Sequence, residues 1–299
     1  MHKMTLNNPN QGFGGMEGNR KNFRKQKHIF KSSGQLQLFS AKKLERSLQR
    51  TGLGTKDCKE ITKEVTEKIK PGTSTKEIFK TTFKLVKKKS PIAATHYSLK
   101  QSLLELGPTG FEFEYFVSKY FNEIGYTTYV GVMFQGEFVR HEVDVVASKP
   151  DYQVYVECKF HNKSGRTNDI KIVLYIKARW DDLRNGPDGK YLKEFYVASN
   201  TSFSKDAIEY AKGTGLQLLG VNVPLEESFL DKIKKLKLYP ITSLKRLKKI
   251  YCQELLLNKI ILCKDLLKEK NLLLKMGMSE EEISSIFKDI NKLIQSQEE

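Results

Sequence analysis

Two apolar strands joined by a turn occupy residues 141–160, HEVDVVASKPDYQVYVECKF. A tight turn at the Pro-Asp pair predicts an antiparallel hairpin in which Asp144 faces Glu157 and Glu142 faces Lys159. These four polar residues share one face, because side chains alternate along a strand. The opposite face is then entirely apolar and consists of Val143, Val145, Ala147, Val154, Val156, Cys158 and Phe160.

The polar face of this hairpin has the groups that phosphodiester hydrolysis needs. Asp144 and Glu157 repel each other unless a cation neutralises them. Mg²⁺ prefers such oxygen ligands, so we predict that both residues bind Mg²⁺, with Mn²⁺ as a possible substitute. Lys159 lies on the same face about 7 Å along the strand, where its ammonium can orient the attacking water. The alternative is a solvated face with a Glu142–Lys159 surface salt bridge worth less than about 1 kcal/mol.

The sequence around the hairpin predicts a sheet flanked by helices. Periodicity and turn residues give the order αβββαβ with a further αβ, which is typical of a mixed sheet. The helices are expected at 111–124, 169–183 and 204–212, and the strands at 127–134, 139–147, 152–160, 194–199 and 216–221. We therefore predict a domain spanning residues 110–222.

The hairpin also resembles a known family signature. Asp144, followed thirteen residues later by Glu157-Cys158-Lys159, is similar to the PD-(D/E)xK motif of the restriction-endonuclease-like superfamily, with Val143 in place of the proline. The αβββαβ order resembles the core of that superfamily. The most similar branch is the Mrr-like, type IV restriction endonucleases, which also resemble archaeal Holliday-junction resolvases.

The resemblance implies a set of functional residues and a substrate. In the family the preceding helix often carries an acid, and Glu114, eleven residues before Gly125, occupies the matching position. DNA is the implied partner. The catalytic residues implied are Asp144, Glu157, Lys159 and Glu114.

Other residues near the hairpin have two possible roles each. Strand parity directs His141 to the apolar side, as a packed or rim histidine, whereas His161 at the strand exit is expected to contact the DNA backbone. Trp180 is expected in the core. Basic residues of the following helix either contact phosphates or belong to a solvated face; they are Lys171, Lys177 and Arg179.

Residues 23–107 predict a small module of one hairpin followed by four helices, and Ser74 and Glu77 form a capping-box match at the third helix. The stretch 29–39 and the following Lys42-Lys43-Leu44 resemble an ATP-cone, the allosteric nucleotide-binding module of ribonucleotide reductases. The resemblance implies ATP or dATP as a ligand; a degenerate cone kept as a helical spacer is the alternative. The phosphate contacts implied are Lys31, Ser33, Gly34 and Lys43.

The two ends of the chain have no strand pattern. Residues 1–22 are rich in Asn and Gly and are expected to form a flexible tail. Residues 223–299 predict basic helices, with 13 Lys or Arg against 4 Asp or Glu between Asp231 and Lys275. This region either holds DNA phosphates or forms a dimerisation element whose polar face is rich in lysine.

Composition agrees with a multidomain α+β and α/β protein. A net charge of +17 favours a polyanionic partner, although a Lys-rich proteome is an alternative explanation, and 39% hydrophobic residues exclude wholesale disorder. Four cysteines without ligand spacing argue against zinc and disulfides, and the sequence contains no long apolar span. We expect a cytoplasmic protein with no membrane partner, and a homo-oligomer is a candidate assembly.

The sequence thus predicts a Mg²⁺-dependent DNA endonuclease that restricts foreign or modified DNA, with ATP or dATP as candidate regulators. A resolvase-like or repair nuclease is the nearest alternative. A nucleotide-sensing DNA-binding regulator without catalysis is a second alternative, and an interaction module is a third.

Overall fold

The computed structural model describes residues 27–31 and 34–295, so the tail predicted at 1–22 lies outside the described residues. A hairpin of β1 (His28–Phe30) and β2 (Leu36–Leu38) opens the described part. Four helices follow: α1 (Ala41–Gln49), α2 (Thr55–Lys68), α3 (Thr75–Lys89) and α4 (Pro91–Leu104). The predicted hairpin with four helices is confirmed, as is the capping box of Ser74 and Glu77 at the start of α3.

A five-stranded mixed sheet forms the middle of the chain, in the spatial order β3-β4-β5-β7-β9. The first three strands are antiparallel, whereas β5, β7 and β9 are parallel. The elements are α5 (Phe111–Glu123), β3 (Thr127–Gln135), β4 (Arg140–Lys149), β5 (Tyr152–Lys159), α6 (Ile170–Asn185), β7 (Leu192–Ser199), α7 (Lys205–Thr214) and β9 (Gln217–Leu219). The predicted αβββαβ order is confirmed. A short parallel pair, β6 (Thr167–Asn168) with β8 (Ser202–Phe203), was not predicted.

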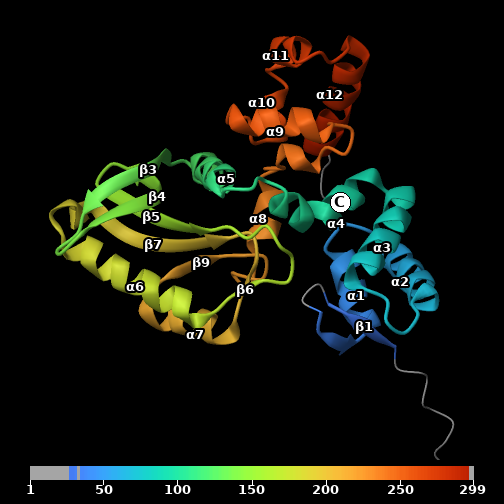
Figure 1. Ribbon diagram of the computed structural model, residues 1–299, viewed down its shortest axis with the longest axis horizontal. Coiled ribbons are helices and arrows are strands. Elements are labelled where there is room, and N and C mark those ends of the chain that lie inside the picture. Colours follow the sequence, from blue (N-terminus) through green and yellow to red (C-terminus); the bar gives the residue numbers. More distant parts are fainter. Residues whose placement is uncertain (1–26, 32–33, 296–299) are drawn as a thin grey trace, which may run out of the picture.

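Helices cover both faces of this sheet (Figure 1). Helix α5 lies on one face, where its aromatic residues pack with Val145 and Val156. Helices α6 and α7 lie on the other, where Val146 and Tyr155 are buried with Trp180. The second face of the predicted hairpin is therefore covered by protein instead of being solvated, and Trp180 is confirmed as a core residue.

The strict alternation expected along β4 fails at Asp144. Val145 packs on the α5 side, but Val143 packs with the α6 side, although the two should share a face. The pairing of β3 with β4 skips Asp144 and Gly131, and Gly131 has a left-handed φ of 68°. This irregularity rotates the first residues of β4 relative to the rest, so the prediction for Val143 was wrong.

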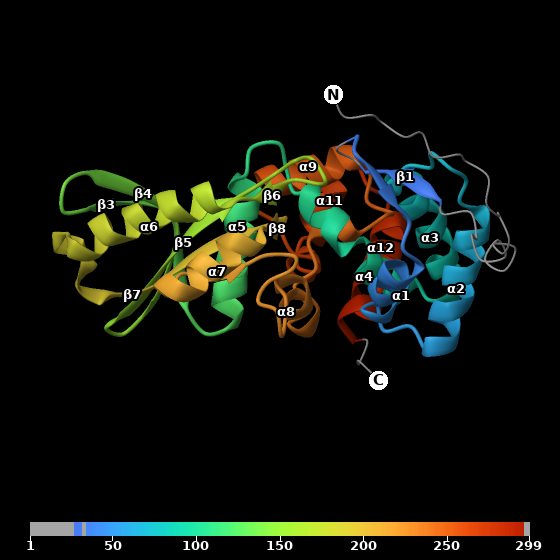
Figure 2. The same ribbon diagram turned by 90° about the horizontal axis from the view of Figure 1, so that it is seen from below.

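The C-terminal region is helical, and residues 223–295 contain no strand. It comprises α8 (Phe229–Lys235), α9 (Lys249–Leu257), α10 (Cys263–Leu266), α11 (Lys270–Lys275) and α12 (Glu280–Gln295). Figures 1 and 2 show the sheet and the N-terminal module at opposite ends of the molecule, and Figure 1 shows the C-terminal helices α9 to α12 above the junction of these two parts. All four cysteines are free thiols.

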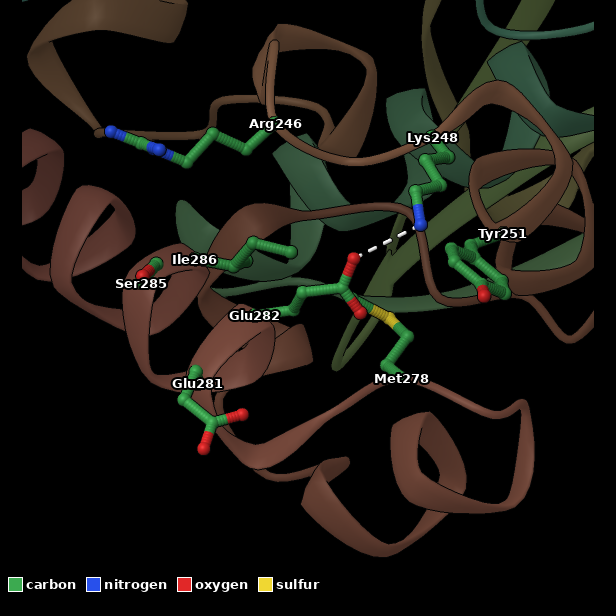
Figure 3. A pocket seen from close by; sticks show the side chains of 8 residues that line it. All are labelled: Arg246, Lys248, Tyr251, Met278, Glu281, Glu282, Ser285 and Ile286. Carbon is green, nitrogen blue, oxygen red and sulfur yellow. Dashed lines mark hydrogen bonds and ion pairs between the residues drawn. The ribbon is translucent and has the colours of Figure 1, made fainter.

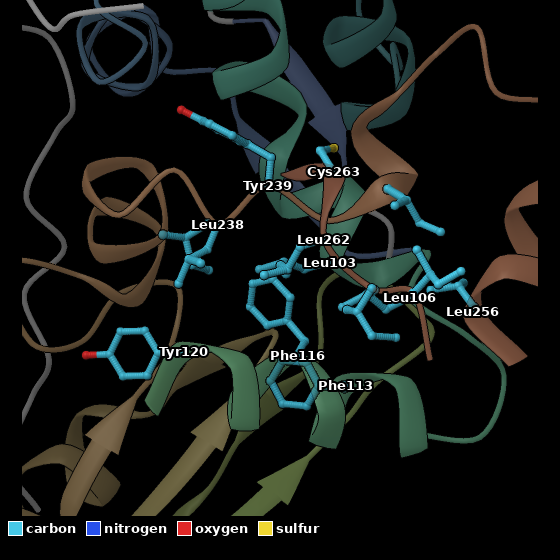
Figure 4. Close-up of a cluster of buried hydrophobic side chains, with 14 of the residues drawn as sticks. Leu103, Leu106, Phe113, Phe116, Tyr120, Leu238, Tyr239, Leu256, Leu262 and Cys263 are labelled. Atoms are coloured by element: carbon cyan, nitrogen blue, oxygen red, sulfur yellow. The ribbon is translucent and has the colours of Figure 1, made fainter. Parts of the chain in front are cut away.

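One apolar core joins these regions (Figure 4). Phe113 and Phe116 of α5 pack beside Leu103, near the end of α4, and beside Leu256 and Leu262 of the C-terminal region. The face of α5 that points away from the sheet is therefore buried by helices from both ends of the chain.

No helix within residues 27–31 and 34–295 is both long enough and apolar enough to cross a bilayer.

Candidate functional site

The predicted register of the hairpin is observed, and it ends where the acidic residues begin. Val146 pairs with Tyr155 as expected, and the ladder continues to Val145 and Val156. Asp144 is not in the ladder. Its Oδ2 instead accepts a hydrogen bond of 2.6 Å from the backbone N–H of Cys158. The Asp144 carboxylate is thereby fixed against the end of β5.

Glu157 is buried, with only 4% of its surface exposed. Its Oε1 accepts from Lys159 Nζ at 2.5 Å, and its Oε2 accepts from a guanidinium N–H of Arg179 on α6. Arg179 also donates to the backbone carbonyl of Glu142. A solvated face with a Glu142–Lys159 salt bridge is therefore excluded, since Lys159 pairs with a buried Glu157. Isolated buried carboxylates are costly, so this one is held by two cations.

Glu114 approaches the same cluster from α5. Burial, followed by the negative charges of Asp144, Glu142 and Glu157, raises the pKa of Glu114 to about 7. Burial and the charge of Glu157 likewise raise the pKa of Asp144 to about 6, against the opposing effects of the Cys158 N–H, Lys159 and Arg179. The structure thus brings the four predicted catalytic residues together beside the first half of β4 and the end of β5, where negative charge is in excess.

The donor chemistry of this cluster fits a hard divalent cation. No group of three or more His, Cys, Asp or Glu side chains in the described part of the chain is already arranged around a metal position. Mg²⁺ does not need one, since it commonly binds one or two carboxylates and keeps its other ligands as water and phosphate. Asp144 and Glu157 supply two such carboxylates, and burial together with the neighbouring carboxylates raises the pKa values of Asp144 and Glu114.

Glu114→Gln is expected to stabilise the metal-free protein at high pH. A raised folded-state pKa contributes stability that is present at low pH and lost as the pH rises through about 7. Removing the charge should therefore increase the free energy of unfolding by about 1–2 kcal/mol at pH 8.5 and by much less at pH 5. Urea denaturation in EDTA measures this, with the exposed Glu254→Gln as control. Equal stability of Glu114→Gln and wild type at pH 8.5 would contradict it.

His141 has a structural role, and its side chain lies on the opposite face of the sheet from the one expected. Its Nε2 lies 2.6 Å from Oδ2 of Asp182 on α6, and Asp182 also accepts the backbone N–H of Phe138. The contact ties the β3–β4 turn to α6. The prediction that His141 is packed is confirmed, but the expected side was wrong because the alternation along β4 shifts at Asp144.

His161 belongs to a buried polar network that the sequence did not reveal. Its Nε2 lies 3.0 Å from Oδ1 of Asn168, and Asn168 donates to Ser199 Oγ. Ser199 in turn donates to the backbone carbonyl of Lys159 at 2.8 Å. The side chain of Asn200 bonds both the N–H and the C=O of His161. This network fixes the backbone after β5, and the only signal for it was the polar run that follows β7. Contact of His161 with DNA remains a prediction.

Arg179 belongs to the carboxylate cluster, although the sequence did not predict it there. It was expected to contact phosphate or to lie on a solvated face, yet its side chain is only 11% exposed and bonds Glu157. Lys177, two residues before Arg179 on α6, pairs with Asp181 instead.

The residues predicted to bind nucleotide lie around the first hairpin and helix. Lys31 Nζ donates to Oε1 of Gln35 at 3.0 Å, and Gly34 closes the turn with a φ of 82°. Lys43 lies in the first turn of α1, where its N–H donates to the N-cap residue Ser40. Ser33 lies outside the described residues. Nucleotide binding therefore remains a prediction.

A hollow of about 400 Å³ lies elsewhere, among the C-terminal helices (Figure 3). Glu282 points across it toward Lys248, and their ion pair measures 3.0 Å. None of the predicted site residues lines it. The carboxylate cluster lies elsewhere, at the end of β5, where Glu157 is buried and Glu114, Asp144 and Lys159 are half-buried.

Comparison with known proteins agrees with the fold of the middle of the chain. Residues 107–222 match a family model described as restriction endonuclease, and residues 239–294 match one described as AF1548-like, C-terminal. An uncharacterized protein of Archaeoglobus fulgidus is 32% identical over 134 residues, which are 45% of this chain and 74% of that protein. The crystal structure of AF1548, a protein of unknown function, is similar with a TM-score of 0.51 and 28% identity, and the match covers 64% of this chain and 98% of that one.

Proposed function

Because the chain belongs to the same family as the uncharacterized Archaeoglobus fulgidus protein, and because residues 107–222 form a restriction-endonuclease-like nuclease domain, we propose that it is a Mg²⁺-dependent DNA endonuclease. One observation supports this above all. Glu157 is buried at the end of β5 between two cationic side chains, with Asp144 and Glu114 beside it. A protein that only bound DNA would gain nothing from a buried cluster of carboxylates next to a phosphate backbone.

Each residue of the cluster has a role in this proposal. Asp144 and Glu157 hold the cation, and the Cys158 carbonyl is a further candidate ligand. A Mg²⁺ ion held there would neutralise the carboxylates and would supply Lewis-acid polarisation of the scissile phosphate. Lys159 orients the water whose oxygen attacks phosphorus while the bond to the leaving oxygen breaks; the attacking water gives up a proton, and the leaving oxygen takes one up from solvent. Glu114, whose pKa lies near 7, can hold or release a proton close to the reacting water.

We further propose restriction of foreign or modified DNA as the role of this activity, with cleavage of branched DNA as the nearest alternative. The hairpin and four helices at 28–104 support a regulatory module. ATP or dATP, bound at Lys31, Ser33, Gly34 and Lys43, is the ligand we propose for it.

The decisive experiment incubates the purified protein with supercoiled plasmid and with four-way-junction DNA, with and without Mg²⁺ and ATP. Wild type is expected to cut only with Mg²⁺, and Asp144→Ala and Lys159→Ala are expected not to cut. Equal nicking by all three proteins would show that the site is assigned wrongly. Binding without cleavage by all three would favour a DNA-binding regulator.

A further inference from the structure

The positive charge of the chain is concentrated in its N-terminal module. Residues 27–107 contain 18 Lys or Arg against 7 Asp or Glu, a surplus of 11. Residues 108–222, which include the nuclease sheet, contain 14 Lys or Arg against 15 Asp or Glu. Residues 223–299 contain 15 Lys or Arg against 12 Asp or Glu. The domain that would cut DNA is thus nearly neutral, and the charge that could retain a polyanion lies on another part of the chain.

The basic residues of the C-terminal helices are largely paired within the protein. Arg246 bonds Asp289, and Lys264 bonds Glu123 of α5. The further pairs of this region are Lys232–Glu227, Lys234–Asp231, Lys235–Glu227, Lys245–Glu105, Lys248–Glu282 and Lys270–Glu280. The local surplus counted between Asp231 and Lys275 is therefore offset by acidic side chains that lie close in space, several of them outside that interval.

Helix α3 differs, because four of its six lysines form a row without a salt bridge to any described residue. Lys76, Lys80, Lys84 and Lys87 fall within an arc of about 80° over a length of about 17 Å. All four are exposed, and within the described part of the chain none of them forms a salt bridge. We call these four residues the lysine row. Like charges at such spacing destabilise a helix, so the row costs stability unless a polyanion meets it.

The opposite side of α3 limits what the partner can be. Ile78, Thr82 and Val86 are buried in the core of the N-terminal module. The helix therefore has no free apolar face to insert into a lipid bilayer, and only its charge is available. Duplex DNA fits a straight row of ammonium groups, since it presents one phosphate charge per about 1.7 Å of its axis.

The N-terminal module lies next to the end of the sheet that carries the candidate site. Asn200, which fixes the backbone after β5 at His161, also donates to the carbonyl of Leu103 in α4. Figures 1 and 2 both show α3 on the side of the module away from the sheet. A duplex on α3 would therefore be held at a distance from the bond that is cut.

We propose that Lys76, Lys80, Lys84 and Lys87 bind the phosphate backbone of the DNA duplex that flanks the cleavage site. The proposal rests on the proposed nuclease function for the identity of the polyanion. The row retains the substrate without reading its sequence, and the nuclease domain supplies the chemistry.

The test measures binding of a 30-bp fluorescent duplex in EDTA at several NaCl concentrations. For the full chain with all four lysines changed to Gln, the slope of log K against log salt is expected to become shallower by about 3–4, because each phosphate contact contributes about 0.9. The matched control changes four other exposed lysines, and its slope is expected to shift by less than about 1. These are Lys193, Lys212, Lys268 and Lys275.

A variant with Arg at all four positions of the row should keep the wild-type slope, and thermal melting verifies that each variant is folded. An unchanged slope in the Gln variant, an equal loss in the control, or a preference of wild type for phosphatidylserine vesicles over the duplex would each overturn the proposal. Cleavage is assayed separately with Mg²⁺. If the wild type binds DNA through the lysine row but does not cut it, the nuclease proposal fails and the lysine-row proposal stands. If the wild type cuts DNA and the Gln variant keeps the wild-type slope, the lysine-row proposal fails and the nuclease proposal stands.

Discussion

Arg179→Ala is expected to lower the free energy of unfolding of the metal-free protein by about 3 kcal/mol, the largest stability loss we foresee for a single substitution at the cluster. The guanidinium bonds both the buried carboxylate of Glu157 and the carbonyl of Glu142, so its removal leaves two acceptors without their donor. Lys159 remains on the other oxygen of Glu157 and limits the loss. Urea denaturation in EDTA at pH 8 measures the effect.

A second variant distinguishes charge from packing. In Glu157→Gln/Arg179→Ala the buried charge is absent, so more than half of the lost stability should return. Mg²⁺ should raise the unfolding midpoint of Arg179→Ala more than that of wild type, because the cation then takes over neutralisation of Glu157. If Arg179→Ala is as stable as wild type, or the double variant is no better than the single one, Arg179 is not holding Glu157 in the way the structure indicates.

Asp144→Asn is expected to change activity and stability in opposite directions. Loss of the carboxylate should slow DNA cleavage by a factor on the order of 10² to 10³, a magnitude typical of removing one electrostatic group from a reacting centre. The folded-state pKa of Asp144 is raised to about 6, so its contribution to stability is present at low pH and is lost as the pH rises through 6. The Asn variant should therefore be more stable than wild type at pH 8.

The control for this variant is Glu142→Gln, which removes an exposed acid two residues away and should slow cleavage by less than about tenfold. Asn retains an oxygen that can accept the Cys158 N–H, so the local backbone should be preserved. Rates come from plasmid nicking with Mg²⁺, and stabilities from urea melts in EDTA. Wild-type cleavage by Asp144→Asn would remove Asp144 from the chemistry.

The order of the elements and the hairpin register could be predicted because both depend on local patterns. Alternating apolar residues and a Pro-Asp turn determine how β4 meets β5, and the pairing of Val146 with Tyr155 follows from them. The positions of Val143 and His141 could not be predicted in the same way. They depend on an irregularity opposite Gly131 in the neighbouring strand, which periodicity within β4 does not reveal.

The sequence predicted which residues belong to the candidate site, but not how they are arranged. Asp144, Glu157 and Lys159 could be found because they lie on one hairpin, and Glu114 because it lies on the helix that precedes the hairpin. Arg179 could not, since its contact with Glu157 depends on how α6 crosses the sheet, and a helix with apolar residues on several sides does not indicate which side faces the acids. The burial of Glu157 has the same origin.

The core beneath α5 has a consequence for how such a chain can be assembled from parts. Phe116 and Tyr120 rest on α4 and on the C-terminal helices, which lie on either side of the nuclease sheet in the sequence. A protein that contained the nuclease domain without these two flanking segments would expose these aromatic rings to water. In this chain the catalytic fold therefore depends on both flanking helical segments to keep the outer face of α5 covered.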